Sequence, residues 1–121
     1  MLWKTVVAAV LALAAGSGAT YYFMSHRVPA MTTPYQAVLL TTGAVYFGQL
    51  EGLGTPFPVM RNVFYVQSVD DAQTKHVNNV LIKRGKEWHE PDRMILNSNM
   101  IVLVEPVSQE SRVAALIAQA K

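Results

Sequence analysis

An apolar run over residues 6–24 dominates the start of the chain. No charged residue interrupts it, and Lys4 and Arg27 stand on either side of it. A helix over residues 5–24 would be about 30 Å long, which is about the thickness of the hydrocarbon core of a bilayer. The pattern therefore predicts a transmembrane anchor over residues 1–27.

The same run has a second interpretation, as a cleaved signal peptide. Lys4 would form its n-region, residues 6–15 its apolar h-region and residues 17–19 (Ser-Gly-Ala) its cleavage site. Against cleavage, the apolar character continues through Tyr-Tyr-Phe-Met at residues 21–24, where aromatic side chains suit a membrane interface. We therefore expect a retained anchor. Its expected interface residues are Trp3, Lys4, Tyr21, Tyr22 and Arg27.

Small residues recur along one face of this predicted helix. They are Ala8, Ala12, Gly16 and Ala19. Such a face lets two membrane helices approach closely, so we expect it to contact another span. The simpler alternative is that alanine is common in such helices.

The short N-terminal tail with Lys4 favours a cytoplasmic N-terminus and an extracytoplasmic domain, in a bacterial inner membrane.

Beyond the anchor, the pattern changes to short apolar runs separated by turn signals. Residues 28–34 hold two prolines and are expected to form a linker to a domain over residues 35–107. The expected strands are residues 37–40, 44–50, 59–68, 80–82, 94–96 and 100–104. The first two should form a hairpin, and Gly48 predicts a bulge or bend because glycine weakens a flat strand. The aromatic residues expected in the core are Tyr46, Phe47, Phe57, Phe64 and Tyr65.

The last segment, residues 108–121, has the pattern of an amphipathic helix. Its apolar residues follow the spacing i, i+3, i+4 and i+7, at Val113, Leu116, Ile117 and Ala120. Ser108 is the expected N-terminal cap of a helix over residues 109–119. We expect this helix to pack on the domain or on a neighbouring subunit.

The order of these signals resembles that of the small SH3-like and Sm-like barrels. In those folds a glycine turn enters a strand that reads roughly V-x-G-x-L, and residues 43–50 (Gly-Ala-Val-Tyr-Phe-Gly-Gln-Leu) look like that. A long bent strand follows, like residues 59–68, and then two short strands around a tight turn, like residues 94–104. The resemblance implies a mainly β fold with a small antiparallel barrel of about five to six strands. One membrane helix with a small barrel also looks like the accessory subunits of bacterial energy-converting complexes.

Charge and composition narrow the classes of function. From residue 35 onward there are four lysines and four arginines against three aspartates and five glutamates, so the domain is neutral. Nucleic-acid binding of the Sm-like kind is therefore the least favoured alternative. The chain has no cysteine, which excludes disulfides and thiolate chemistry.

Catalytic and metal-binding chemistry is not expected. The titratable candidates are His76, Glu87, His89, Glu90 and Asp92, and their spacing favours a solvated loop over a ligand set. No nucleophile motif and no phosphate-binding loop is present. The sequence predicts no catalytic site, no metal site and no cofactor, and hence a protein that is not an enzyme.

The best candidate for partner binding is the polar loop over residues 83–93, where basic side chains accompany a tryptophan. Its candidate residues are Lys83, Arg84, Lys86, Trp88 and Arg93. Arginine and tryptophan are enriched at interface hot spots, although an ordinary solvated loop would look similar.

We expect an accessory or assembly subunit of a larger bacterial membrane complex, with respiratory and photosynthetic assemblies as candidate hosts and a homo-oligomer left open. The alternative is a membrane-tethered module that recruits a soluble partner through this loop.

Overall fold

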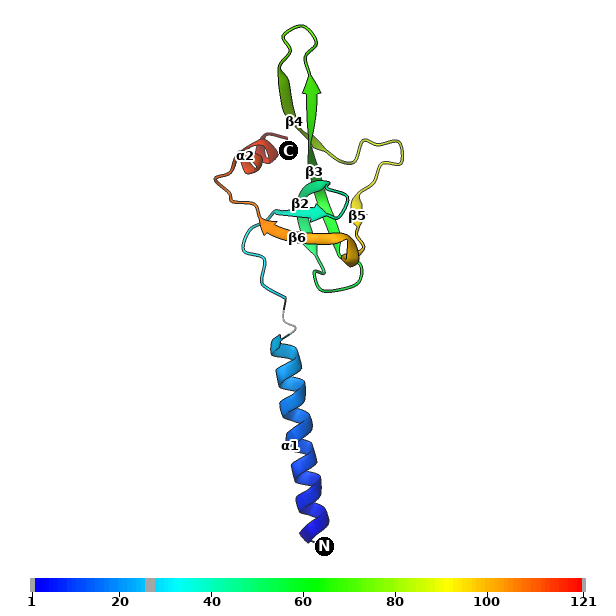
Figure 1. Ribbon diagram of the computed structural model, residues 1–121, viewed down its shortest axis with the longest axis vertical. Coiled ribbons are helices and arrows are strands. Elements are labelled where there is room, and N and C mark those ends of the chain that lie inside the picture. The colour runs from blue at the N-terminus through cyan, green and yellow to red at the C-terminus, as the bar shows by residue number, and fades with distance from the viewer. Residues whose placement is uncertain (1, 26–27, 121) are drawn as a thin grey trace.

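The computed structural model describes residues 2–25 and 28–120, with the backbone alone over residues 21–25. The protein has an N-terminal helix, an antiparallel sheet of six strands and a C-terminal helix (Figure 1). The elements in order are α1 Leu2–Ser25, β1 Gln36–Leu40, β2 Val45–Glu51, β3 Val59–Asp70, β4 Val77–Lys83, β5 Arg93–Ile95, the 3-10 turn η1 Ser98–Met100, β6 Ile101–Pro106 and α2 Arg112–Ala120. The predicted mainly β fold with one helix at each end is confirmed.

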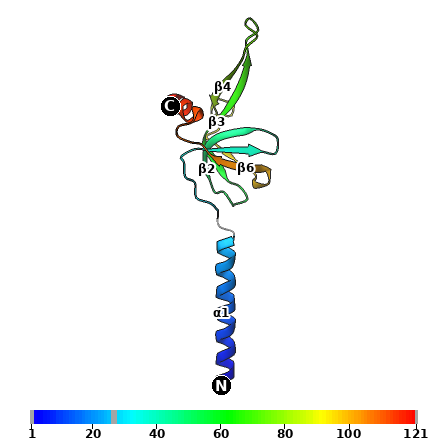
Figure 2. The same ribbon diagram turned by 60° about the vertical axis from the view of Figure 1, so that its left-hand side comes forward.

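Helix α1 is a separate rod on which the sheet does not pack. It has 24 residues, which corresponds to about 36 Å. Every side chain from Leu2 to Thr20 is exposed, and both views show the helix standing apart from the sheet (Figures 1 and 2). The segment Leu2–Thr20 is long and apolar enough to cross a membrane, a property that a signal sequence shares.

The sheet has the strand order β4-β3-β2-β1-β6, and β5 pairs with β3 beside this path. The predicted β1–β2 hairpin is confirmed, with Val38 opposite Tyr46. In the described part of the chain the end strands β4 and β6 are not paired with each other, so the sheet is open. Closure into an SH3-like or Sm-like barrel is thus not shown.

The register between β2 and β3 shifts at Gly48, where the sequence predicted a bulge or bend, but the bulged strand is β3. Phe47 faces Phe64 and Gln49 faces Arg61, so β3 carries one extra residue here. That residue is Asn62, whose φ of 50° is left-handed and whose side-chain amide donates to Gln49 Oε1 at 2.7 Å. A Cβ at position 48 would lie 3.0 Å from the carbonyl oxygen of Arg61, so glycine allows the close approach of β3.

The core lies on one face of the sheet. Its buried cluster consists of Val38, Leu50, Met60, Val63 and Leu96. Phe64 is buried outside this cluster and packs edge-to-face on Tyr35, with ring centroids 6.3 Å apart. The prediction that Phe57 belongs to the core is wrong, because its side chain is 65% exposed in the loop between β2 and β3.

Strands β3 and β4 form a longer hairpin than the sequence suggested. The strands predicted over residues 59–68 and 80–82 are too short, since β3 continues to Asp70 and pairs there with Val77, where β4 begins. Polar side chains extend the ladder: Ser68 Oγ and Asn79 Oδ1 are 2.9 Å apart across the strands. The hairpin projects from the rest of the sheet in both views (Figures 1 and 2).

Helix α2 begins later than predicted. Its cap is Ser111, whose Oγ accepts from the amide of Ala114 at 3.1 Å. The predicted cap, Ser108, instead accepts from the amide of Glu110 within a preceding turn, directly after Val107, whose amide donates to Tyr35 O. Ile117 is 2% exposed and α2 contacts β4, so the predicted packing of this helix on the domain is confirmed.

Candidate interaction site

The predicted partner-binding residues lie along one edge of β3. Strand β4 pairs with the second half of β3, and β5 pairs with its first half along the same edge. Lys83 ends β4 and Arg93 begins β5, so the connecting loop is residues 84–92 rather than 83–93. We call this segment the Trp88 loop. It emerges beside the bulge, where the amide of Arg84 donates to Val63 O at 2.8 Å.

Local hydrogen bonds give the Trp88 loop a defined shape. The amide of Gly85, a glycine with φ of 131°, donates to Glu87 Oε2 at 2.9 Å. This bond is the main cause that holds the pKa of the Glu87 carboxyl below its usual 4.5, and Arg84 contributes to the same effect. The carbonyl of Glu87 accepts from the amide of Glu90 at 2.8 Å. The acidic side chain therefore shapes the loop.

Arg84 is engaged within the chain. Its Nε lies 3.6 Å from Glu87 Oε1, and its guanidinium carbon lies 5.8 Å from the ring centroid of Tyr46. The Nε atom itself is buried and has no hydrogen-bond partner in the described structure. Stacking on an aromatic ring is a common use of arginine. Arg84 therefore supports the loop, and it is poorly placed to meet a partner.

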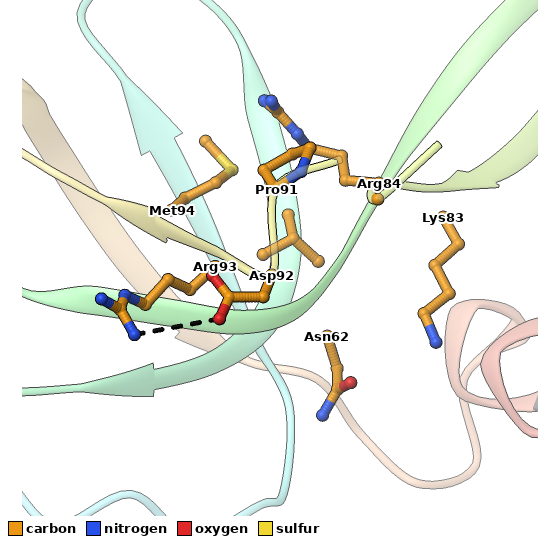
Figure 3. Close-up of a pocket in the computed structure, with 9 residues that line it drawn as sticks. Asn62, Lys83, Arg84, Pro91, Asp92, Arg93 and Met94 are labelled. Carbon is orange, nitrogen blue, oxygen red and sulfur yellow. Dashed lines mark ion pairs between the residues drawn. The ribbon is translucent and has the colours of Figure 1, made fainter. Parts of the chain in front are cut away.

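A polar hollow of about 240 Å³ lies beneath the Trp88 loop (Figure 3). Lys83, Arg84 and Arg93 all line it, but Lys83 and Arg84 point in different directions, and Arg93 Nη1 lies 3.9 Å from Asp92 Oδ2. Lys83 Nζ lies 6.0 Å from the ring centroid of Phe64. Because these cations do not converge on one point, the hollow lacks the geometry of an anion site.

Trp88 is the most exposed large apolar residue of the described structure. Its side chain is fully exposed, and Lys86 and His89 beside it are exposed as well. Exposed tryptophan is costly in solution and is typical of binding surfaces. Of the predicted residues, four are exposed and remain available to a partner: Lys83, Lys86, Trp88 and Arg93. Arg84 is instead engaged inside the domain.

The titratable candidates do not assemble into a metal site. Across the described residues, no three His, Asp or Glu side chains come close enough to hold a metal ion. His76 ends the turn of the β3–β4 hairpin, whereas His89 lies in the Trp88 loop.

The predicted helix-packing face lies entirely on the exposed surface of α1. Ala8, Ala12, Gly16 and Ala19 are all exposed, and Thr20, which sequence reasoning left out, borders the same shallow hollow as Ala12 and Gly16. Its hydroxyl donates to Gly16 O at 3.0 Å. The spacing of four residues from Gly16 is a signal that could have identified Thr20.

Of the predicted interface residues, Trp3 and Lys4 are exposed at the N-terminal end of α1. Arg27 and the side chains of Tyr21 and Tyr22 lie outside the described residues.

Sequence reasoning also missed Gln36, a buried polar residue at the point where the linker enters the sheet. Its Oε1 accepts from the amide of Leu50 at 2.9 Å, and its Nε2 donates to Thr33 O at 2.6 Å. These two hydrogen bonds connect Thr33 of the linker to Leu50 of β2. The alternation of Gln36 with Val38 on the inward face of β1 was the available signal.

In comparisons with known proteins, the chain matches no family model, and no curated protein is significantly similar to it.

Proposed function

We propose that this chain is a non-enzymatic, single-pass accessory or assembly subunit of a larger bacterial membrane complex. One observation carries the proposal: every described side chain of α1 from Leu2 to Thr20 is exposed, so this stretch of the helix is not covered by the described part of the domain. An apolar helix of this length is stable among lipids or other spans. A retained anchor is favoured over a cleaved signal sequence by the apolar and aromatic residues that continue after residue 19.

The proposed arrangement places the N-terminus in the cytoplasm and the sheet domain outside the inner membrane. The flanking charges support this orientation through Lys4 on the short N-terminal tail. The domain itself is proposed as an incompletely closed relative of the SH3-like barrels. This part of the proposal is supported by the pairing of β3, which pairs with β2 on one edge and with β4 and β5 on the other. Respiratory and photosynthetic complexes are the proposed hosts.

Substitution of Gly16 tests the packing face. Gly16→Ile places a branched side chain on that face, and we expect it to release the chain from its complex because the helices can no longer approach closely. The measurement is migration on a native gel after extraction in a mild detergent. The matched control is Gly18→Ile, which lies about 160° away around the helix axis, since each residue turns about 100°. A Cβ at either position meets no atom within 4 Å, so neither change strains the chain itself.

The control variant should migrate with the complex. Equal migration of the Gly16→Ile and Gly18→Ile variants in one large complex would contradict a packing role for this face. Migration of the unmodified chain as a free monomer would contradict the accessory-subunit proposal as a whole.

A second candidate function is a membrane-tethered module that recruits a soluble partner. The full exposure of Trp88 beside Lys86 favours it. Combining Trp88→Ala with Lys86→Glu should weaken binding of a soluble partner by about 30-fold, which corresponds to the loss of one hot spot of about 2 kcal/mol. The measurement is quantitative recovery of soluble proteins with the tagged chain. The control combines Lys75→Glu with Val77→Ala, two exposed positions on the β3–β4 hairpin. Equal recovery with both double variants would remove the Trp88 loop as the binding surface.

A further inference from the structure

A second exposed aromatic residue lies on the loop between β2 and β3. This loop, residues 52–58, has the sequence Gly-Leu-Gly-Thr-Pro-Phe-Pro and carries no charge; Glu51 precedes it and Arg61 is the next charged residue after it. We call it the Phe57 loop. The side chain of Phe57 is 65% exposed. The prolines on both sides of it limit how the backbone can move. An exposed phenylalanine in an uncharged loop is well suited to contact an apolar surface.

The Phe57 loop is held rigidly, so the phenylalanine is not exposed through disorder. Gly52 and Gly54 have φ values of 75° and 94°, and the amide of Thr55 donates to Gly52 O at 3.0 Å. On either side of Phe57, the carbonyl oxygens of Pro56 and Pro58 accept from the amides of Ser98 and Leu96, at 3.0 and 2.8 Å. These bonds fix the backbone before and after Phe57, and the side chain is presented outward.

The same loop lies close to the end of α1. A Cβ placed on Gly54 would lie 2.5 Å from Val28 Cγ2, so Val28 packs directly against this glycine. Val28 follows Ser25, the last residue of α1, by three positions, and three residues span at most about 11 Å. The Phe57 loop is also at the end of the domain nearest α1 in both views (Figures 1 and 2). Chain length therefore keeps the loop near the point where a membrane-spanning α1 leaves the bilayer.

We infer that the Phe57 loop inserts into the interfacial region of the lipid leaflet in which α1 ends, so that the domain rests on the bilayer at a second point. This inference rests on the proposed membrane span of α1. Val28 and Met31 are also partly exposed apolar residues of the adjoining linker, and they extend the same uncharged surface. Aromatic side chains are favoured at the boundary between headgroups and acyl chains, and a loop without charges loses no ionic hydration on entering it.

Lipid contact can be measured with a single tryptophan. In the full chain with Trp3→Phe and Trp88→Phe, one variant carries Phe57→Trp and the control carries Val77→Trp, at an exposed position on the distant hairpin. Both are reconstituted alone into phosphatidylcholine vesicles with or without brominated acyl chains. We expect bromine to quench the Phe57→Trp reporter several-fold more than the control, and aqueous acrylamide to quench it several-fold less.

Each other outcome has a definite meaning. Equal quenching of the two reporters, in protein that resists carbonate extraction, would overturn the inference and leave the proposed span intact. Protection of the Phe57→Trp reporter only in native membranes would indicate a protein partner and would also overturn it. Extraction of the unmodified chain by carbonate would instead overturn the proposed span. If Phe57→Trp alters the circular dichroism spectrum, broadening of the Phe57 amide signal by spin-labelled lipid in nanodiscs makes the same measurement on the unmodified chain.

Discussion

Replacing Phe64 with alanine is expected to lower the free energy of unfolding of the domain by about 3–5 kcal/mol. Phe64 is 1% exposed, and its ring packs against Tyr35 where the linker joins the sheet. Removing the ring leaves a cavity and removes the edge-to-face contact. A folded domain is stable by only about 5–15 kcal/mol, so this loss is a large fraction of the total. Urea unfolding of the full chain in detergent micelles, followed by circular dichroism, measures it.

The matched control is Phe57→Ala, which removes the same atoms from a side chain that is 65% exposed. In micelles this variant should unfold at nearly the same urea concentration as the unmodified chain, because surface substitutions usually change stability by less than about 0.5 kcal/mol. Equal destabilisation by the two substitutions would mean that Phe57 is covered, by the domain or by detergent, as fully as Phe64 is, contrary to its described exposure.

Placing an arginine at the middle of α1 is expected to prevent stable insertion into the membrane. Leu11 lies at the centre of the segment Leu2–Thr20. An arginine at the centre of a span costs about 2.5–3.5 kcal/mol, and the favourable contribution of leucine is lost as well. We therefore expect Leu11→Arg to move much of the chain into the carbonate-soluble fraction, measured by membrane flotation after carbonate treatment.

Leu11→Val serves as the control for this change, because it keeps the position apolar and should leave the chain in the floating membrane fraction. Full retention of the Leu11→Arg variant in that fraction would show that α1 is not what holds the protein to the membrane.

The sequence specified the fold class well because its signals are local. The uncharged run of α1, the glycine turn before β2 and the alternation in β3 each follow from neighbouring residues. Phe57 and Phe64 show where such reasoning ends. Phe57 precedes β3 and Phe64 lies within it, and the backbone on either side of Phe57 is held by bonds from Ser98 and Leu96. Those partners lie about forty residues away along the chain, beyond the reach of a local pattern.

The candidate site shows the same division between local and long-range information. The Trp88 loop could be predicted from its composition, since basic residues surround a tryptophan between two strands. The role of Arg84 could not, because its aromatic partner Tyr46 lies on β2 and is brought near by the register of β2, β3 and β4. The late start of α2 has a similar cause, since the bond from Val107 to Tyr35 delays the helix until Ser111 can cap it.

The attachment of the linker has a mechanical consequence. Tension on the N-terminal helix would reach the domain through Thr33 and Gln36, and so would enter the sheet at β1. This strand is bordered by β2 on one side and β6 on the other. Force along it must therefore shear two hydrogen-bonded ladders together, and it cannot unzip an edge one bond at a time. The domain is thus joined to α1 through one of the sheet's interior strands, which suits it to withstand pulling through that helix.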